Sequence, residues 1–188
     1  MHTLKDYDRE PNKAYADPSK LEIHFLTPSE QSNSWYDDVW YKGNMIHEYA
    51  HIPFYKDLCS KPEDYKEAPE WFSEGFAEYC KIFASNDKEI LEKYRCKLNK
   101  IKEMVKSDEG RLVFECKDEH CIYCGGAYII KYIYETYGQE KVIRLIKSQE
   151  LSFAKAIEEL GVTIREFENN WLKWACKEFN VDAKVYKI

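Results

Sequence analysis

The sequence predicts an α+β fold that is mainly helical, with a small strand element near the N-terminus and a helical C-terminal part. Residues 20–27 alternate between polar and apolar side chains, a pattern typical of a half-buried strand. From residue 44 onward, apolar residues recur at helical spacing almost to the end of the chain, most regularly over residues 87–106. Proline and glycine residues separate these segments, so we expect several helices of ordinary length.

Length and composition indicate one domain with its own core. The chain has 188 residues, of which 44% are hydrophobic and 15% aromatic, enough apolar surface for a stable core. We expect a loosely ordered lead-in over residues 1–20 and a single domain over residues 21–188. Within that domain, residues 21–106 hold the motifs with chemical character, and residues 107–188 form the helical C-terminal part.

Charge and hydropathy argue against two classes of partner. The formal net charge is −6, and lysine and arginine are interleaved with acidic residues, so nucleic acid is not an expected partner. The most apolar stretch is far shorter than the roughly 20 residues that span a bilayer, so a membrane is not expected either. The sequence leaves the oligomeric state open.

The seven cysteines predict reduced thiols and a cytoplasmic location, because an odd number cannot all pair within one chain. The N-terminal residues contain no apolar run that would indicate a secretory signal, although secretion with partial pairing stays open. Cys116, His120, Cys121 and Cys124 are close enough in sequence to form a second metal site. Thiols packed at the start of a helix are the simpler interpretation.

Turn and capping residues place the expected elements of the first half of the chain. A second extended piece is expected over residues 38–41. Asn44 is a candidate N-cap for a helix over residues 45–52, which Pro53 should stop or kink. A helix over residues 69–84 begins with a proline, which suits its first turn.

The second half is expected to join helices by short polar turns. Residues 111–116 form a candidate strand. A buried helix is expected over residues 123–137, ended by Gly138, and a further helix over residues 140–147. The last helix begins at Thr163, where the sequence T-I-R-E matches a capping box.

The most distinctive feature is an H-E-x-x-H motif, His47-Glu48-Tyr49-Ala50-His51, within an expected helix. Side chains four residues apart lie on one helix face, so His47 and His51 can present two imidazoles to a tetrahedral zinc ion. Glu48 lies about 100° round the helix from His47, beside that ion, where it can accept a proton from bound water. The motif predicts a site for one Zn²⁺ per chain.

A second motif offers the third ligand, since a catalytic zinc needs three protein ligands and an open position for water. Glu74, on the expected second helix, can supply a carboxylate, and Gly75 can let the two motif-bearing helices approach closely at the metal. Glu78, one turn beyond Glu74, can hydrogen-bond the far nitrogen of a ligand histidine and fix its tautomer. The aromatic and small neighbours of these glutamates argue against a merely solvated helix face.

The two motifs resemble those of the gluzincin metallopeptidases, in the peptidase MA-like families, whose second motif reads W-x-x-E-G-x-A-x-x-E or a shorter variant. The matching residues are Trp71, Glu74, Gly75, Ala77 and Glu78. This resemblance implies a zincin catalytic domain in which His47, His51 and Glu74 bind zinc, Glu48 is the general base and Glu78 supports a ligand histidine. It spans roughly residues 21–178 and is specific in the two motifs.

A further segment, residues 123–131, resembles the start of a helix that reads Y-E-K-G-A in gluzincin aminopeptidases and carries an oxyanion-stabilising tyrosine. The resemblance implies that Tyr123 is this catalytic tyrosine, with Tyr128 as the alternative. The G-x-M-E-N segment that binds the substrate's amino group in those aminopeptidases is missing here. Endopeptidase activity is therefore favoured over aminopeptidase activity.

The expected function is hydrolysis of peptide bonds in a peptide or protein substrate by a zinc metallopeptidase. A metzincin arrangement would place the third ligand at Asp57, but it needs a glycine at position 54, where this chain has Phe54. Two non-catalytic interpretations stay open. One is a peptidase-fold module that binds or regulates without cleaving, and the second is a structural zinc domain closed by a fourth protein ligand.

Overall fold

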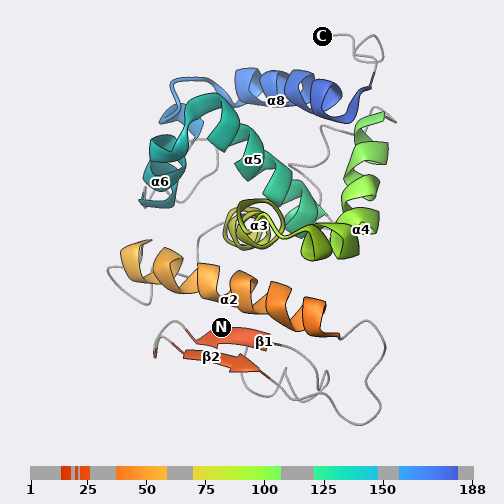
Figure 1. The fold of residues 1–188 in the computed structure, drawn as a ribbon. Helices are drawn as coiled ribbons and strands as arrows, with labels where there is room; N and C mark the ends of the chain where they lie inside the picture. Colours follow the sequence, from red (N-terminus) through yellow and green to blue (C-terminus); the bar gives the residue numbers. More distant parts are fainter. Residues whose placement is uncertain are drawn as a thin grey trace.

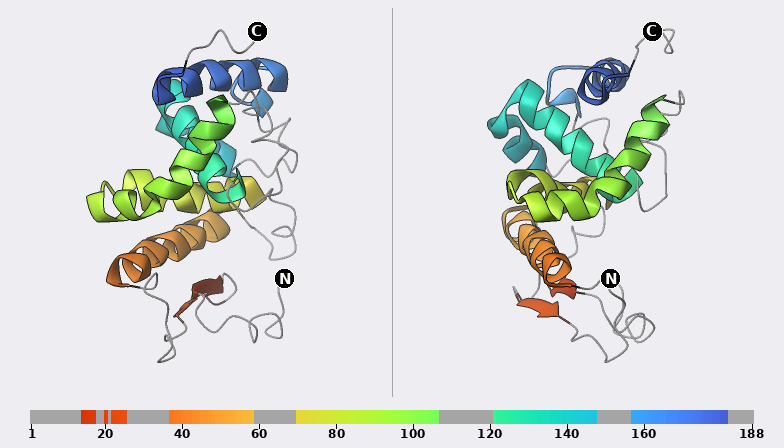
Figure 2. Two further views of the ribbon diagram at one scale, coloured as in Figure 1. Left: turned by 90° about the vertical axis from the view of Figure 1, so that its right-hand side faces the viewer. Right: turned by 45° about the vertical axis from the view of Figure 1, so that its right-hand side comes forward.

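The coarse fold class is confirmed: the described residues are mainly helical, with a small two-stranded antiparallel sheet. In the computed structural model the described residues are 14–17, 20, 22–25, 37–58, 70–106, 121–147 and 157–181. The sheet lies against one side of helix α2 (Asp38–Leu58), and helix α3 (Glu70–Tyr79) lies against the other (Figure 1). The remaining helices stack beyond α3, an order that the two turned views in Figure 2 repeat.

The sheet pairs β1 (Ala14–Asp17) with β2 (Glu22–Phe25) in antiparallel register, with Ala14 opposite Phe25 and Asp17 opposite Glu22. β2 confirms the strand expected within residues 20–27. β1 lies within residues 1–20, where we expected a loosely ordered lead-in, so that expectation is wrong for this segment. The alternation that predicted β2 extends over residues 20–27, whereas β1 has no alternation beyond its own four residues.

Helix α2 begins earlier than the sequence predicted, because Asp37 rather than Asn44 caps it. The backbone N–H of Trp40 donates to Asp37 Oδ1 at 2.9 Å, which satisfies one of the free donors of the first turn. The extended piece expected over residues 38–41 is therefore the first turn of α2. Asn44 lies inside the helix, and its side chain contacts the site described below.

Pro53 does not end α2, which continues to Leu58. Proline removes one backbone donor and crowds the preceding turn, at a cost of about 3 kcal/mol in a helix interior. Contacts of α2 with both strands of the sheet and with α3 oppose that cost. The prediction of a stop or kink took into account only the local effect of the proline on the helix, without these tertiary contacts.

Helix α3 passes directly into a π-helical turn, η2 (Cys80–Ala84), so the helix expected over residues 69–84 is present with a widened last turn. Helix α4 (Lys88–Lys106) matches the expected helix over residues 87–106. Asp87 caps it by accepting from the backbone N–H of Glu89 at 2.9 Å. The apolar residues at helical spacing that predicted α4 form its buried face: Ile90, Tyr94, Leu98, Ile101 and Val105.

The C-terminal helices also agree with the sequence, apart from a π-helical start. A π-turn, η4 (Cys121–Gly125), leads into α5 (Gly126–Tyr137), which ends at Gly138 with φ of +84°. Helix α6 (Gln139–Lys147) follows, and α8 (Ile164–Phe179) begins with the predicted capping box at Thr163. The candidate strand over residues 111–116 lies outside the described residues.

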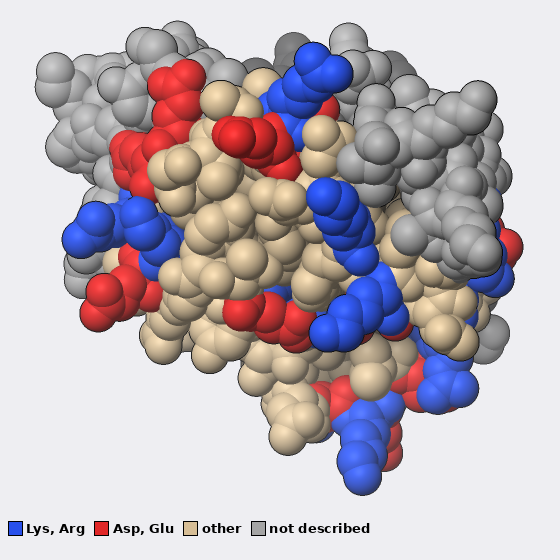
Figure 3. All heavy atoms as spheres, turned by 90° about the horizontal axis from the view of Figure 1, so that it is seen from above, with Lys and Arg blue, Asp and Glu red and all other residues tan. Residues whose placement is uncertain are grey.

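The hydrophobic core surrounds α5, which packs against α3, α6 and α8. Within α5, Ile129, Ile130 and Ile133 are almost fully buried. The ring of Tyr132 packs against the ring of Phe167 of α8, with the ring centroids 5.3 Å apart. On the outer face above α8, basic and acidic side chains are interspersed (Figure 3). Among the described residues, none of the helices combines the length and apolar character needed to cross a membrane.

Gly75 permits a close approach of helices, but the helix that it meets is α5 rather than α2. A Cβ atom at Gly75 would lie 2.6 Å from Cα of Gly126 and 2.7 Å from its carbonyl carbon. The expectation that Gly75 brings the two motif-bearing helices together is therefore wrong. Two glycines facing each other instead let the backbones of α3 and α5 touch, which fixes α3 and its glutamates against the core.

Gly75→Ala is expected to destabilise the protein by about 1–3 kcal/mol or more, because backbone on both sides must move to admit one methyl group. The matched control is Gly43→Ala in α2, where a Cβ would meet only the flexible stem of Lys81, at 3.5 Å. Alanine favours a helix over glycine by up to about 1 kcal/mol, so the control should be neutral or stabilising. Urea denaturation measures both, and equal midpoints for the two variants would contradict the contact.

Candidate metal centre

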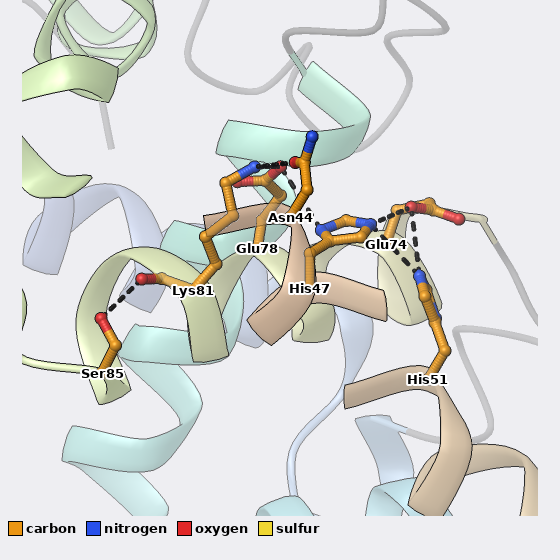
Figure 4. Close-up of polar contacts among 7 residues, drawn as sticks. All are labelled: Asn44, His47, His51, Glu74, Glu78, Lys81 and Ser85. Atoms are coloured by element: carbon orange, nitrogen blue, oxygen red, sulfur yellow. Dashed lines mark hydrogen bonds and ion pairs between the residues drawn. The ribbon is translucent and has the colours of Figure 1, made fainter. Parts of the chain in front are cut away.

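His47 and His51 of α2 and Glu74 of α3 bring three potential ligand atoms to one point (Figure 4). His47 Nε2 lies 3.1 Å from Glu74 Oε2 and 3.2 Å from His51 Nε2, and His51 Nε2 lies 3.6 Å from Glu74 Oε2. Both histidines are buried, whereas the Glu74 side chain keeps 23% of its surface exposed. Helices α2 and α3 therefore present a shielded pair of imidazoles beside a carboxylate that solvent can reach.

The spacing of these atoms fits a tetrahedral metal ion. Ligand atoms at about 2.0–2.1 Å from a tetrahedral centre lie about 3.3 Å apart. The three separations, 3.1, 3.2 and 3.6 Å, scatter around that value. Two imidazole nitrogens and one carboxylate oxygen are also a donor set found in catalytic zinc sites and in sites for other transition metals.

Neighbouring charges keep the acidic groups of the site ionised. Burial lowers the pKa of His47, but the nearby carboxylates of Glu74 and Glu78 outweigh it and raise that pKa to about 9. Burial raises the pKa of Glu74, but the two histidines hold it well below its usual range. Burial likewise raises the pKa of Glu78, and Lys81 with His47 lowers it to about 2. Both carboxylates are therefore anionic at neutral pH and suited to a cation.

The second nitrogen of His47 faces Glu78, as the sequence predicted for a supporting carboxylate. His47 Nδ1 lies 3.5 Å from Glu78 Oε1, and the Glu78 side chain is only 6% exposed. The same oxygen accepts a hydrogen bond of 2.7 Å from Lys81 Nζ, which also donates to Asn44 Oδ1 at 3.3 Å. Figure 4 shows these side chains in a continuous row leading away from the ligand atoms.

Of the two candidate tyrosines, Tyr123 is the one that contacts the site. Its ring stacks on that of His47, with centroids 5.9 Å apart and an interplanar angle of 20°. Tyr128 lies in the core, where its ring packs edge-on against Phe179 at 4.9 Å. The π-turn η4 carries Tyr123, so this irregular turn places the ring beside α2.

Glu48 follows His47 on α2 and is partly exposed. Its position about 100° round the helix from His47 directs it beside, not into, the group of three ligands. The side chains of Trp71, Phe54 and Asp57 lie outside the described part of the structure, so the metzincin alternative stays a sequence argument.

The second metal site considered for the cysteines loses one of its four ligands. Cys121 is disulfide-bonded, and Cys80, Cys96, Cys124 and Cys176 are free thiols, so its partner is not among them. Cys124 is a buried free thiol, and burial raises its pKa to about 12. The disulfide also corrects the expectation that all the thiols are reduced, because cysteine number alone carries no information on distances. The two remaining members of the cluster, at positions 116 and 120, lie outside the described residues.

Comparison of the chain with protein-family models, with curated proteins and with solved structures gives no match. The gluzincin resemblance therefore rests on the residues of the two motifs.

Sequence reasoning missed Lys81 and the role of Asn44. Each has a partial signal: Asn44 is three residues before His47, and Lys81 is three residues after Glu78, so each pair shares a helix face. A lysine within the largely apolar stretch that follows Glu78 is itself unusual and points to a buried partner. Lys81 is buried beside the candidate site only because of the way α2 and α3 pack, and this packing cannot be predicted from a local sequence pattern.

Proposed function

We propose that the chain is a zinc-dependent metallopeptidase of the gluzincin type, acting on a peptide or protein substrate. The observation that carries the proposal is the group of three ligand atoms from two helices at tetrahedral spacing. The H-E-x-x-H motif supplies two of these atoms, and the E-G-x-A-E segment supplies the third. Two independent stretches of sequence thus contribute to one point in space.

In this proposal His47, His51 and Glu74 hold the ion, which when bound polarises a water molecule and the scissile carbonyl. Glu48 accepts a proton from that water and later delivers it to the leaving amine, which is the task of a general base and acid. Tyr123 donates a hydrogen bond to the oxyanion. Glu78 keeps the imidazole of His47 in one tautomer and orientation.

Two features favour a catalytic site over the non-catalytic interpretations of the motif. The described residues contribute three ligand side chains to the group, and a catalytic zinc keeps its fourth position for water or substrate, whereas a structural zinc has four protein ligands. A carboxylate at the Glu48 position serves proton transfer and has no purpose in a module that only binds.

Glu74→Ala is expected to abolish tight zinc binding, because a site of two neutral imidazoles lacks the charge and number of ligands that hold the ion. Metal content by mass spectrometry, on protein purified without chelator or affinity-column metal, should give about one zinc per wild-type chain and far less in the variant. The matched control is Glu103→Ala on α4, whose side chain is 66% exposed and does not belong to the group.

Activity is tested by incubating the zinc-loaded protein with a mixture of peptides, with and without a chelator. Cleavage that the chelator stops and added zinc restores is the expected result. A wild-type chain that takes up no metal even after zinc addition would contradict the proposal. In the cobalt-substituted protein, an absorption spectrum that indicates four protein ligands to the metal would point to a structural site instead.

A further inference from the structure

A buried lysine lies directly behind the candidate metal centre. Lys81 is 2% exposed, and an isolated ammonium group in such a place would be strongly unfavourable. Its charge is balanced by Glu78 Oε1 at 2.7 Å, and Asn44 Oδ1 at 3.3 Å accepts a second hydrogen bond. The Nζ atom also lies 4.0 Å from the centroid of the Tyr94 ring, a cation–π contact.

One oxygen of Glu78 connects this lysine to a metal-ligand histidine. Glu78 Oε1 lies 2.7 Å from Lys81 Nζ and 3.5 Å from His47 Nδ1. Since Lys81 holds that oxygen, it fixes the rotamer of Glu78 and so the direction from which the carboxylate meets the imidazole. The row runs Asn44, Lys81, Glu78, His47, and its two ends belong to the same face of α2 (Figure 4).

The backbone around Lys81 is shaped to admit its side chain. Lys81 lies in the π-turn η2, and turns of this kind inside helices are frequent at functional sites. Its stem passes over Gly43 of α2, where even a Cβ atom would come within 3.5 Å of Lys81 Cε. Larger side chains at position 43 would therefore displace the stem, and the glycine keeps the path to Glu78 open.

We propose that Lys81 is a positioning residue of the metal centre, which sets the affinity for zinc by holding Glu78 against His47 Nδ1. This inference rests on the proposed zinc site. Groups that orient a ligand histidine from behind typically contribute 10–100-fold to metal affinity. Lys81 acts on the ion only through Glu78, and that indirect route can be tested directly.

The test measures zinc affinity by competition with a chromogenic chelator for wild type, Lys81→Met and Lys97→Met. Methionine keeps most of the stem and removes the charge. Lys81→Met is expected to weaken zinc binding by about 10-fold or more, the lower part of the range for such residues. Lys97→Met is the matched control, because Lys97 lies over the same Tyr94 ring, at 5.5 Å, and should leave the affinity unchanged.

A double-mutant cycle separates positioning from general damage. In a Glu78→Gln background, Lys81→Met should cause no further loss of affinity, since the carboxylate through which Lys81 acts on His47 is already gone. The NMR signals of the His47 ring nitrogens in the zinc-loaded protein should change in Lys81→Met and stay as in wild type in Lys97→Met. Equal losses of affinity in both backgrounds would overturn the inference.

If Lys81→Met does not fold, Asn44→Ala decides the question, because it removes one acceptor of the lysine and leaves the charge pair in place. A smaller loss of affinity, again absent in the Glu78→Gln background, supports the inference, and an unchanged affinity overturns it. Failure of the zinc site itself gives a different result: the wild-type chain then binds no zinc. If the wild-type chain binds zinc and Lys81→Met binds it with the same affinity, the role of Lys81 is refuted and the proposed zinc site is not.

Discussion

Glu48→Gln is expected to keep its zinc and to lose about 10²–10⁴-fold in the rate of peptide hydrolysis, the usual contribution of a general base. Glutamine has nearly the same shape as glutamate but cannot take a proton at neutral pH. Glu48 is not one of the three residues whose ligand atoms converge, so the metal content should stay near that of wild type. The measurement combines metal content with chelator-sensitive cleavage of the best peptide from the mixture.

The matched control for this substitution is Glu140→Gln, an exposed glutamate in the first turn of α6. It makes the same chemical change on the same protein and should leave cleavage at the wild-type rate. Wild-type cleavage by Glu48→Gln would remove Glu48 from the role of base. Loss of metal together with activity would instead make Glu48 part of the ligand set, a result that the spacing of the motif argues against.

The helical part of the fold was predictable where each helix carries its own signals. The capping box at Thr163 marks the start of α8, and Gly138 marks the end of α5. Each signal lies in the sequence at the helix end that it determines. The start of α2 was missed because Asn44 alone was considered as the cap, whereas Asp37 Oδ1 accepts from the backbone N–H of Trp40. β1 was missed because no alternating pattern extends beyond its four residues, whereas β2 lies within an alternation over residues 20–27.

The group formed by His47, His51 and Glu74 was more predictable than the surroundings of the candidate site. The spacing of His47 and His51 fixes their shared face within one helix, and the glutamates of the second motif are one turn apart. The structure brings the two histidines together with Glu74 as those motifs predicted. The row of polar groups behind them was not predictable, because Lys81 reaches Glu78 only after α2 and α3 have packed.

Removal of the charge of Glu78 is expected to cost about 3–5 kcal/mol of the free energy of unfolding in the zinc-free protein. Glu78→Gln leaves the ammonium group of Lys81 buried, with Asn44 and neutral groups as its remaining partners. The side chains of Lys81 and Glu78 are only 3% and 6% exposed, so water cannot take the place of the lost carboxylate. Urea denaturation with chelator present measures the loss apart from any effect of zinc.

The double variant Glu78→Gln with Lys81→Met tests whether the loss comes from the stranded charge. Replacing both partners of a buried ion pair by uncharged groups of similar size is often nearly neutral, so the double variant should recover most of the stability lost by Glu78→Gln. Glu103→Gln is the control for a surface pair, because Glu103 and Lys106 are 66% and 42% exposed and their contact should contribute at most about 1 kcal/mol. Additive losses in the double variant would mean that Glu78 and Lys81 stabilise the fold independently. A recovered stability combined with weakened zinc binding would instead show that the buried pair serves the metal centre rather than the stability of the fold.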